Sequence, residues 1–444
     1  MPVFLECFSE QIKAKRDRIR EMLTRGRTSP LDQALGGLLR SHWLPTAASP
    51  LEMEVVAVDG SRALRPYASG AFLYIVHAMA LWRGRRFRLL EADTFLSKAR
   101  ASAISAFVNT RMEYLEFEVA KKAILEGGLA GGALLMDGSL HGRMAHLPRD
   151  GPAEGMKGFM LHYFESLYQL LELCRQRRIL ILGVSKDSRS SFLRDYLLNI
   201  LLVQELDSLK DLDRQDRDRL VTLFDMAFES PGHAFAGLRA LKERYGDRLS
   251  RLEEILREAA AARPDHQLIR NYVEAAGHSV PMELGFGGKR GRLIERIEQA
   301  PEDFARRYFR EAALESRDED EFIQGAVERL KLIPDLPTII SFHVLLDPRD
   351  TPIRVDTPSW VFRINRRLHD LKGNQRALVN VNDIIGALLA GYAGLRDYNI
   401  WLKRVDEEVR LTRSIVNELY IPALEKLLGV TVVHSRGYRR VKYP

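Results

Sequence analysis

Two apolar runs that each end in the tripeptide Asp-Gly-Ser constrain this chain more than any other feature. Residues 55–62 read Val-Val-Ala-Val-Asp-Gly-Ser-Arg, and residues 134–140 read Leu-Leu-Met-Asp-Gly-Ser-Leu. Short apolar runs bounded by turn residues are typical of buried strands, although a buried helix gives a similar pattern. We therefore expect two core strands that each deliver an aspartate, Asp59 and Asp137, at the point where the strand stops.

Signals along the rest of the chain predict an α/β protein with a mixed sheet. Residues 72–91 are expected to form a hairpin, and residues 98–126 a long helix that ends at a pair of glycines. A third apolar strand is predicted at 178–184, followed by the polar sequence Ser-Lys-Asp-Ser-Arg. Strand signals return at 338–346 and 353–364, which predict a second hairpin that rejoins the sheet.

The same signals divide the chain into four parts. Residues 1–52 are predicted to be an N-terminal helix and a connector, and residues 53–204 the first part of a sheet core. Residues 205–335 have charged helical patterns and few β-branched residues, which favours a helical insertion. Residues 336–444 are expected to complete the core with the second hairpin and C-terminal helices.

The charge balance is basic, with 67 Lys and Arg residues against 60 acids and a formal net charge of +7. Several bases are clustered, which suits a polyanion such as nucleic acid, although a single cluster is more often a solvated face. The candidates for DNA contact are Arg62, Arg189, Lys289 and Arg290.

Other features exclude some classes of protein. The two cysteines, Cys7 and Cys174, indicate neither a disulfide framework nor a structural zinc site. No run approaches the roughly 18 apolar residues of a membrane helix, and the first ten residues lack a signal-peptide pattern. We therefore expect a cytoplasmic protein with no membrane partner.

Aspartates at strand ends, with a third acid nearby, are suited to a site for Mg²⁺ or Mn²⁺, which prefer carboxylate oxygen. Such ions orient the water that attacks a phosphodiester and stabilise the leaving oxygen. Glu116 is our choice for the third acid; Glu113 shares its helix face, and Glu118 lies roughly opposite.

Two residues after the third strand could support the same chemistry. Lys186 is suited to neutralise a phosphate oxygen, and Asp187 is a possible further ligand. Each of these features also has a purely structural interpretation. Asp-Gly-Ser usually marks a turn, a Glu-rich helix is usually a solvated face, and an isolated lysine is usually a surface residue.

Taken in order, these motifs resemble those of the NurA family of archaeal and bacterial nucleases over nearly the whole chain. The resemblance is carried by Val58-Asp59-Gly60-Ser61, Leu115-Glu116-Phe117-Glu118-Val119-Ala120, Met136-Asp137-Gly138-Ser139-Leu140, Gly183-Val184-Ser185-Lys186-Asp187-Ser188-Arg189 and Pro352-Ile353-Arg354-Val355-Asp356-Thr357-Pro358.

The resemblance implies an RNase H-like core and a Mn²⁺-dependent nuclease that acts on DNA as a homodimer. It also implies a HerA-type hexameric DNA-pumping ATPase as partner, in DNA end resection and repair by homologous recombination. By the same resemblance, Asp59, Glu116 and Asp137 match the metal-binding acids of the family, and Lys186 matches its lysine after the third strand.

The chain departs from the family pattern at a late helix, where the family usually has a histidine. The nearest segment, residues 391–399, contains none, so Asp397, Asn399 and Asp383 are the candidate replacements. This departure motivates an alternative, a catalytically weak or inactive NurA-like DNA-binding adaptor of the same ATPase. An RNase H-fold enzyme that acts on RNA or hybrids is a third possibility.

Overall fold

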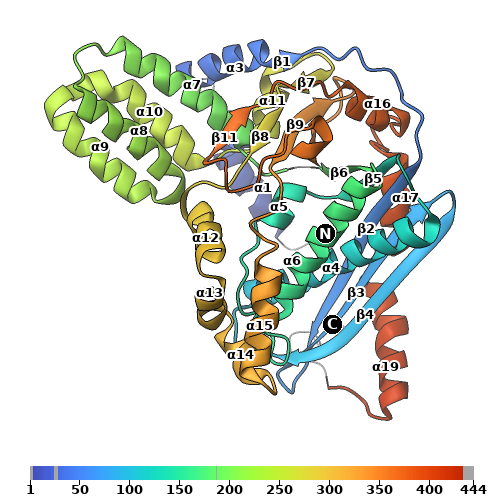
Figure 1. The fold of residues 1–444 in the computed structure, drawn as a ribbon. Helices are drawn as coiled ribbons and strands as arrows, with labels where there is room; N and C mark the ends of the chain where they lie inside the picture. The colour runs from blue at the N-terminus through green and yellow to red at the C-terminus, as the bar shows by residue number, and fades with distance from the viewer. Residues whose placement is uncertain (1–3, 25–28, 187, 434–444) are drawn as a thin grey trace.

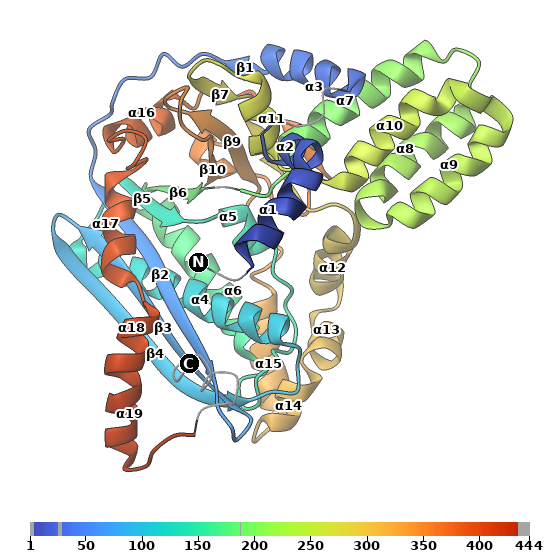
Figure 2. The same cartoon turned by 180° about the vertical axis from the view of Figure 1, so that it is seen from behind.

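The computed structural model describes residues 4–24, 29–186 and 188–433, and within them one mixed sheet has helices on both faces (Figure 1 and Figure 2). Its strands are β1 (Trp43–Leu44), β2 (Val55–Pro66), β3 (Ala71–Trp82), β4 (Arg85–Leu96), β5 (Ala133–Asp137), β6 (Leu180–Ser185), β7 (Gly277–Ser279), β8 (Met282–Leu284), β9 (Ile339–Leu345), β10 (Ile353–Pro358) and β11 (Asn374–Arg376). The strand order is β1-β7-β9-β10-β6-β5-β2-β3-β4, and β8 pairs with β9 and β11 off this path.

Strands β2 to β6 form the predicted RNase H-like part of the sheet. β3 pairs antiparallel with β2 and β4, whereas β5 lies parallel between β2 and β6. The β3–β4 hairpin turns at Arg83 and Gly84, whose φ angles of 48° and 78° match the left-handed geometry that tight hairpins need. The first predicted hairpin and the predicted fold class are thus confirmed.

The late hairpin is also confirmed. β9 and β10 pair antiparallel, and β10 joins the core by pairing antiparallel with β6. β10 ends at Pro358, earlier than its sequence predicts, and a 3₁₀ turn follows at Ser359–Phe362. Because proline lacks an N–H group, it cannot donate a hydrogen bond to a sheet ladder beyond this point.

Some helices cover the two faces of this sheet, and others form a lobe beside it (Figure 1). They are α1 (Leu5–Ala14), α2 (Arg16–Thr24), α3 (Pro30–Ser41), α4 (Ala101–Gly127), α5 (Leu140–Met144), α6 (Phe159–Gln176), α7 (Phe192–Ser208), α8 (Arg214–Glu229), α9 (Pro231–Tyr245), α10 (Ser250–Ala261), α11 (Asp265–Tyr272), α12 (Gly288–Gln299), α13 (Pro301–Tyr308), α14 (Arg310–Glu315), α15 (Glu319–Leu330), α16 (Asn382–Ala390), α17 (Ile400–Val409), α18 (Arg413–Ile415) and α19 (Ile421–Leu428).

Alternating side chains of β2 anchor helices on opposite faces of the sheet. Val56 and Val58 belong to the apolar cluster that contains the buried side of α4. Ala57, which lies between them, belongs to the cluster that contains Leu402 and Val405 of α17. Successive side chains of a strand point to opposite faces, so α4 and α17 lie on opposite sides of β2.

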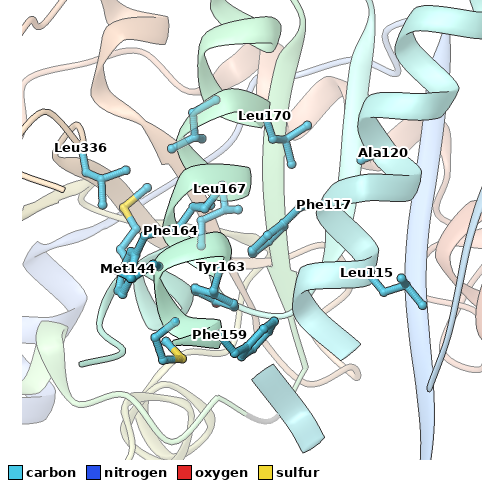
Figure 3. Close-up of a cluster of buried hydrophobic side chains, with 14 of the residues drawn as sticks. Leu115, Phe117, Ala120, Met144, Phe159, Tyr163, Phe164, Leu167, Leu170 and Leu336 are labelled. Carbon is cyan, nitrogen blue, oxygen red and sulfur yellow. The ribbon is translucent and has the colours of Figure 1, made fainter. Parts of the chain in front are cut away.

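Aromatic packing fixes α4 against α6 (Figure 3). The ring of Phe117 on α4 packs on Tyr163 of α6 with a centroid separation of 5.3 Å, and Tyr163 packs edge-on against Phe159. Offset and edge-on pairs of this kind are favourable beyond the area that they bury. These rings therefore fix the position of the long helix that carries Glu116 relative to α6.

β2 is longer than its sequence predicts. The strand was expected to stop at Asp59, but it continues through Gly60 to Pro66, paired with β3 along its length. The expectation of a turn was wrong because β3 provides partners for the backbone groups that a turn would otherwise satisfy. What stops is the parallel pairing of β2 with β5, whose last pair is Val58 with Met136. The sheet therefore opens directly beside Asp59.

The interval 205–335 contains helices α8 to α15, but it also contains two short strands that its pattern does not predict. Strands β7 and β8 pair with β9 and return this interval to the sheet. Helices α8 to α10 pack with α3 and α7 around an apolar cluster of their own, in which Leu35, Phe224 and Leu252 are fully buried. The predicted domain boundaries stay a prediction.

The N-terminal segment is more structured than a helix and a connector. Where one N-terminal helix is predicted there are two, α1 and α2, and the segment predicted as a connector contains α3. The side chains of Leu35 and Leu39 on α3 are fully buried, so this helix is part of a core. None of the helices in the described part of the chain is long and apolar enough to cross a membrane.

Candidate active site

Four carboxylates line one cleft of about 640 Å³ at the place where the sheet opens beside β2. Asp59 comes from β2, Asp137 from the end of β5, Glu116 from α4 and Asp406 from α17. The first three are the acids singled out in the sequence. Since α4 and α17 lie on opposite faces of the sheet, the opening between β2 and β5 is what lets acids from both faces meet.

Asp59 and Asp137 repel each other, and Lys186 lies beside Asp137 as a partial counter-charge. Burial, followed by the negative charges of Asp137 and Glu116, raises the pKa of Asp59 well above its usual range. Burial also raises the pKa of Asp137, although the charges of Lys186 and Arg143 oppose that increase. A pair of carboxylates whose charge is penalised in this way gains stability from any cation that joins it.

Glu116 is almost fully buried and approaches β2 closely. A Cβ atom built on Gly60 would lie 2.5 Å from Glu116 Oε1, so only glycine leaves room for this side chain. Arg143, which is also buried, places its Nη2 atom 2.5 Å from Glu116 Oε2. Arg143 also donates to the backbone oxygen of Asp137, at 2.6 Å, and so links α4 to the end of β5.

The neighbouring glutamates of α4 have other partners. Glu113 also lines the cleft, but it accepts hydrogen bonds from Tyr163 at 2.6 Å and Asn109 at 2.8 Å, and its Oε2 lies 2.9 Å from His146 Nε2. Glu118 accepts a bond from Ser166 of α6, at 2.6 Å, on a different side of the helix. Glu116 is therefore the glutamate of α4 that projects toward Asp59.

Lys186 lies at the mouth of the cleft, directly after β6. Its Nζ atom is 3.6 Å from Asp137 Oδ2 and 4.7 Å from the ring centroid of Tyr398. The Tyr398 hydroxyl is buried and forms no hydrogen bond within the described residues. Burial and the charges of Asp137 and Asp59 raise the pKa of Tyr398, so its hydroxyl keeps its proton next to the acids.

Sequence reasoning missed Asp406. Its negative charge raises the pKa of both Asp59 and Asp137, which places it among the acids of the cleft. A signal was present, because Asp406 lies one position after Val405 and four after Leu402, both buried against the sheet. An acid next to the apolar stripe of a helix lies at the edge of its buried face, which makes it a candidate site residue.

The three residues proposed to replace the late histidine do not line this cleft. Asp397 forms an ion pair with Lys403 at 2.5 Å. Asn399 caps the first turn of α17 by accepting the backbone N–H of Leu402 at 3.0 Å, and Asp383 is exposed in the first turn of α16. Tyr398, between the first two, is the residue of this segment that contacts Lys186.

The hydroxyls of the two Asp-Gly-Ser tripeptides have structural partners. Ser61 accepts the backbone N–H of Leu411 at 2.9 Å, which ties the end of α17 to β2. Ser139 caps α5 by accepting the N–H of Gly142 at 2.9 Å, and it donates to Asp356 at 2.6 Å. Both serines therefore help to place the elements that carry the acids.

The proposed DNA-contacting bases are dispersed. Arg62 lies on β2, does not line the cleft, and donates to Ser105 of α4 at 3.3 Å. Arg189 is exposed just beyond Ser188, whereas Lys289 and Arg290 begin α12 and do not line the cleft. Asp187 lies outside the described residues.

The residues of the cleft fit a hard divalent cation. Carboxylate oxygen is the donor that Mg²⁺ and Mn²⁺ prefer, and the repelling pair Asp59 and Asp137 lacks a full counter-charge. Within the described residues no three His, Cys, Asp or Glu side chains form a ready-made metal cage. Mg²⁺ is usually held by one or two carboxylates, waters and substrate phosphates, so a complete protein cage is not required.

A family model described as the NurA domain matches residues 53–411, from just before β2 to just after α17. The chain belongs to the NurA domain family. All four acids of the cleft lie within the matched NurA domain, together with Lys186 and Tyr398.

Among solved structures, the crystal structure of the NurA nuclease from Sulfolobus solfataricus covers 96% of this chain and 98% of its own, with a TM-score of 0.53 and 13% identity. At that identity the likeness shows a shared fold. A crystal structure of NurA with manganese covers 94% of this chain and 98% of its own, with a TM-score of 0.39 and 15% identity. No curated protein matches the chain.

Proposed function

We propose that this NurA-domain protein is a metal-dependent DNA nuclease that hydrolyses phosphodiester bonds with Mn²⁺, or Mg²⁺, as cofactor. The observation that carries the proposal is the meeting of Asp59, Glu116, Asp137 and Asp406 on one cleft, from two strands and two helices. Within the described residues Arg143 pairs with Glu116, Lys186 with Asp137 and Arg410 with Asp406, so the charge of Asp59 is left without a counter-charge of its own. A divalent cation would neutralise that charge, and a phosphate needs such a cation in order to approach the acids.

Each residue has a proposed role. Asp59 and Asp137 hold the metal, with Glu116 and Asp406 completing the acid set; the bound ion would polarise the phosphate and lower the pKa of the attacking water. Lys186 stabilises a phosphate oxygen at the mouth of the cleft. Tyr398 positions Lys186, whose Nζ atom lies 4.7 Å from its ring centroid, and the buried Tyr398 hydroxyl keeps its proton next to the acids.

The family resemblance extends the proposal to partners. We expect the chain to act as a cytoplasmic homodimer on single strands and duplex ends, by exonuclease and endonuclease cleavage. Its partner would be a HerA-type hexameric ATPase, in DNA end resection and repair by homologous recombination. The net charge of +7 supports a polyanionic substrate, although it does not select DNA over RNA.

The first test is cleavage of labelled single-stranded DNA by Asp59→Ala and Asp137→Ala with Mn²⁺. We expect both variants to lose cleavage while their circular dichroism and melting curves stay those of a folded protein. Asp383→Ala, which removes an exposed aspartate outside the cleft, is the matched control and should cleave normally. Near-normal cleavage by either cleft variant would overturn the assignment.

The adaptor alternative is tested by the wild-type chain alone and with its ATPase. Inactivity in both cases, with intact salt-sensitive DNA binding, would favour the adaptor. Asp406 favours the enzyme, because it supplies an acid from a late helix where the family histidine is missing. A panel of DNA, RNA and hybrid strands distinguishes a DNA nuclease from an enzyme that acts on RNA.

A further inference from the structure

A second cleft, of about 630 Å³, adjoins the acid cleft and shares His146 with it. One wall is the first half of α4, including Phe107. The loop after α5 supplies Arg149, and the end of α13 supplies Arg307 and Tyr308. The two clefts therefore follow one helix, since α4 also carries the acid Glu116.

The wall of the second cleft that α13 and α14 form is fixed to the loop after α5 by hydrogen bonds. The carboxylate of Asp150 accepts the backbone N–H groups of Glu311 at 2.8 Å and Ala312 at 3.0 Å. The backbone N–H of Asp150 donates to the carbonyl oxygen of Tyr308 at 2.8 Å. Glu311 also forms an ion pair with Lys157. The cleft is therefore preformed, with α13 and α14 fastened to the loop after α5.

These bonds leave an excess of positive charge in the second cleft. Its two carboxylates, Asp150 and Glu311, are engaged as just described. Arg149 and Arg307 are both exposed, and neither forms a hydrogen bond or ion pair with a carboxylate within the described residues. The positive charge of this cleft suits the phosphates of a polyanion. The neighbouring acid cleft is negative and would admit the adjoining phosphate of the same strand only together with a cation.

We propose that the second cleft holds the single strand of DNA next to the bond that is cleaved. This inference rests on the proposed nuclease function. Arg149 and Arg307 contact phosphates, and the half-buried ring of His146 provides a surface against which a base packs. Phe304 stacks on the Tyr308 ring at a centroid separation of 4.3 Å and the Arg307 guanidinium lies 5.6 Å from its centroid, so Tyr308 supports Arg307.

The dimensions agree with this assignment. A helix rises about 1.5 Å per residue, so α4 advances about 14 Å between Phe107 and Glu116. This distance is longer than the spacing between two successive phosphates of a strand, so the two clefts would hold different phosphates. The helices α13 and α14 of the interval 205–335 thereby gain a role in guiding DNA.

The test is binding of a 5′-fluorescein-labelled oligothymidine strand, measured by anisotropy in metal-free buffer with EDTA at several salt concentrations. We expect Arg149→Gln and Arg307→Gln each to raise the Kd several-fold. Each should also reduce the slope of log K against log salt by about 0.7, the value for one phosphate contact with a single strand.

The matched control is Arg306→Gln, which removes the same charge from the neighbouring position. Arg306 pairs with Glu302 at 3.1 Å and Asp320 at 3.2 Å and does not line the cleft. It should bind like the wild type. Equal affinity and equal salt slope for the Arg306, Arg307 and Arg149 variants would overturn the assignment of the second cleft.

Failure of this inference is distinguishable from failure of the nuclease proposal. If the wild type cleaves DNA and the Arg149 and Arg307 variants bind DNA as well as it does, the nuclease proposal stands and the proposal of a strand-binding cleft is wrong. If only those two variants lose affinity for DNA and the wild type does not cleave it, the proposal of a strand-binding cleft stands and the adaptor alternative is favoured.

Discussion

Burial and mutual repulsion give the acids of the cleft properties that none would have alone. Burial is the largest cause of the raised pKa of Asp59, Asp137 and Glu116, and the charges of neighbouring acids add to it at all three. Arg143 and Lys186 offset part of this penalty from two sides. The remaining negative charge is what a divalent cation would neutralise.

The late-helix acid gives the sharpest prediction at this scale. Asp406→Ala should weaken Mn²⁺ binding about 10- to 100-fold, because it removes negative charge beside Asp59 and Asp137. Isothermal titration with Mn²⁺ measures the effect. Asp406→Glu should retain binding, since it keeps a carboxylate, the ligand that such ions prefer.

Asp397→Ala is the control for that experiment, because Asp397 is paired with Lys403 outside the cleft. It should bind Mn²⁺ like the wild type. If Asp406→Ala and Asp397→Ala had the same affinity, Asp406 would have no part in the metal site.

At the scale of elements, the turn from β5 into α5 is held by a buried carboxylate of β10. Asp356 accepts the Ser139 hydroxyl at 2.6 Å and the backbone N–H of His141 at 3.2 Å. Arg354 donates to both oxygens of Asp356, at 2.9 and 3.0 Å, and this pair holds the pKa of Asp356 below its usual range despite burial. The late hairpin thus positions Asp137 without reaching the cleft.

Removing one partner of this pair should be costly. Asp356→Ala leaves the buried guanidinium of Arg354 uncompensated, so we expect the free energy of unfolding to fall by about 3–5 kcal/mol. Urea unfolding measures the loss. The double variant Arg354→Met with Asp356→Leu should lose less than Asp356→Ala alone, because it leaves no unpaired charge.

A matched control for this pair is Asp370→Ala, which breaks a partly exposed ion pair with Arg367. That change should cost at most about 1 kcal/mol. A cost for Asp356→Ala as small as that of the control would show that the buried pair does not hold the β5–α5 turn.

At the scale of the whole molecule, the two largest apolar clusters lie in the sheet core and in a lobe attached to it. The core around α4 and α6 supports the acid cleft, whereas the core around α7 to α10 forms the lobe drawn in green at the upper left of Figure 1. Strands β7 and β8 attach this lobe to β9, and α11 packs beside α7. Asp195 of α7 lies at this junction, next to the buried Asp265 of α11.

The junction makes stability depend on pH. Burial, and then the charge of Asp265, raises the pKa of Asp195 to about 8. Between pH 4 and 8 the folded protein holds a proton that the unfolded chain has released. The stability that the bound proton provides is therefore fully present below the pKa that Asp195 has in the unfolded chain. It is lost as pH rises from that value through 8, by up to about 1.4 kcal/mol per pH unit.

Asp195→Asn removes the titration and keeps an acceptor for Ser191, which now donates to Asp195 at 2.9 Å. Urea unfolding at pH 5, 6.5 and 8 should show the variant gaining stability relative to the wild type as pH rises. Stability curves of the two proteins that stay parallel across this range would contradict the assigned pKa.

The sequence by itself determined the order of the core. Apolar runs and paired turn residues predicted the two hairpins, the long helix and the strands that deliver Asp59 and Asp137, because these depend on local preference and burial. It also identified Glu116 and Lys186 as companions of these acids. Its prediction of a turn at Asp59 was wrong, because pairing with a distant partner strand overrides a local turn preference.

Only the tertiary structure decided which late residue completes the cleft. Asp406 and Tyr398 reach the acids because α17 packs on the sheet face opposite α4, beside the opening between β2 and β5. Arg143 reaches Glu116 because α5 follows the end of β5. No local pattern specifies such approaches, since they depend on how separate elements pack across one sheet.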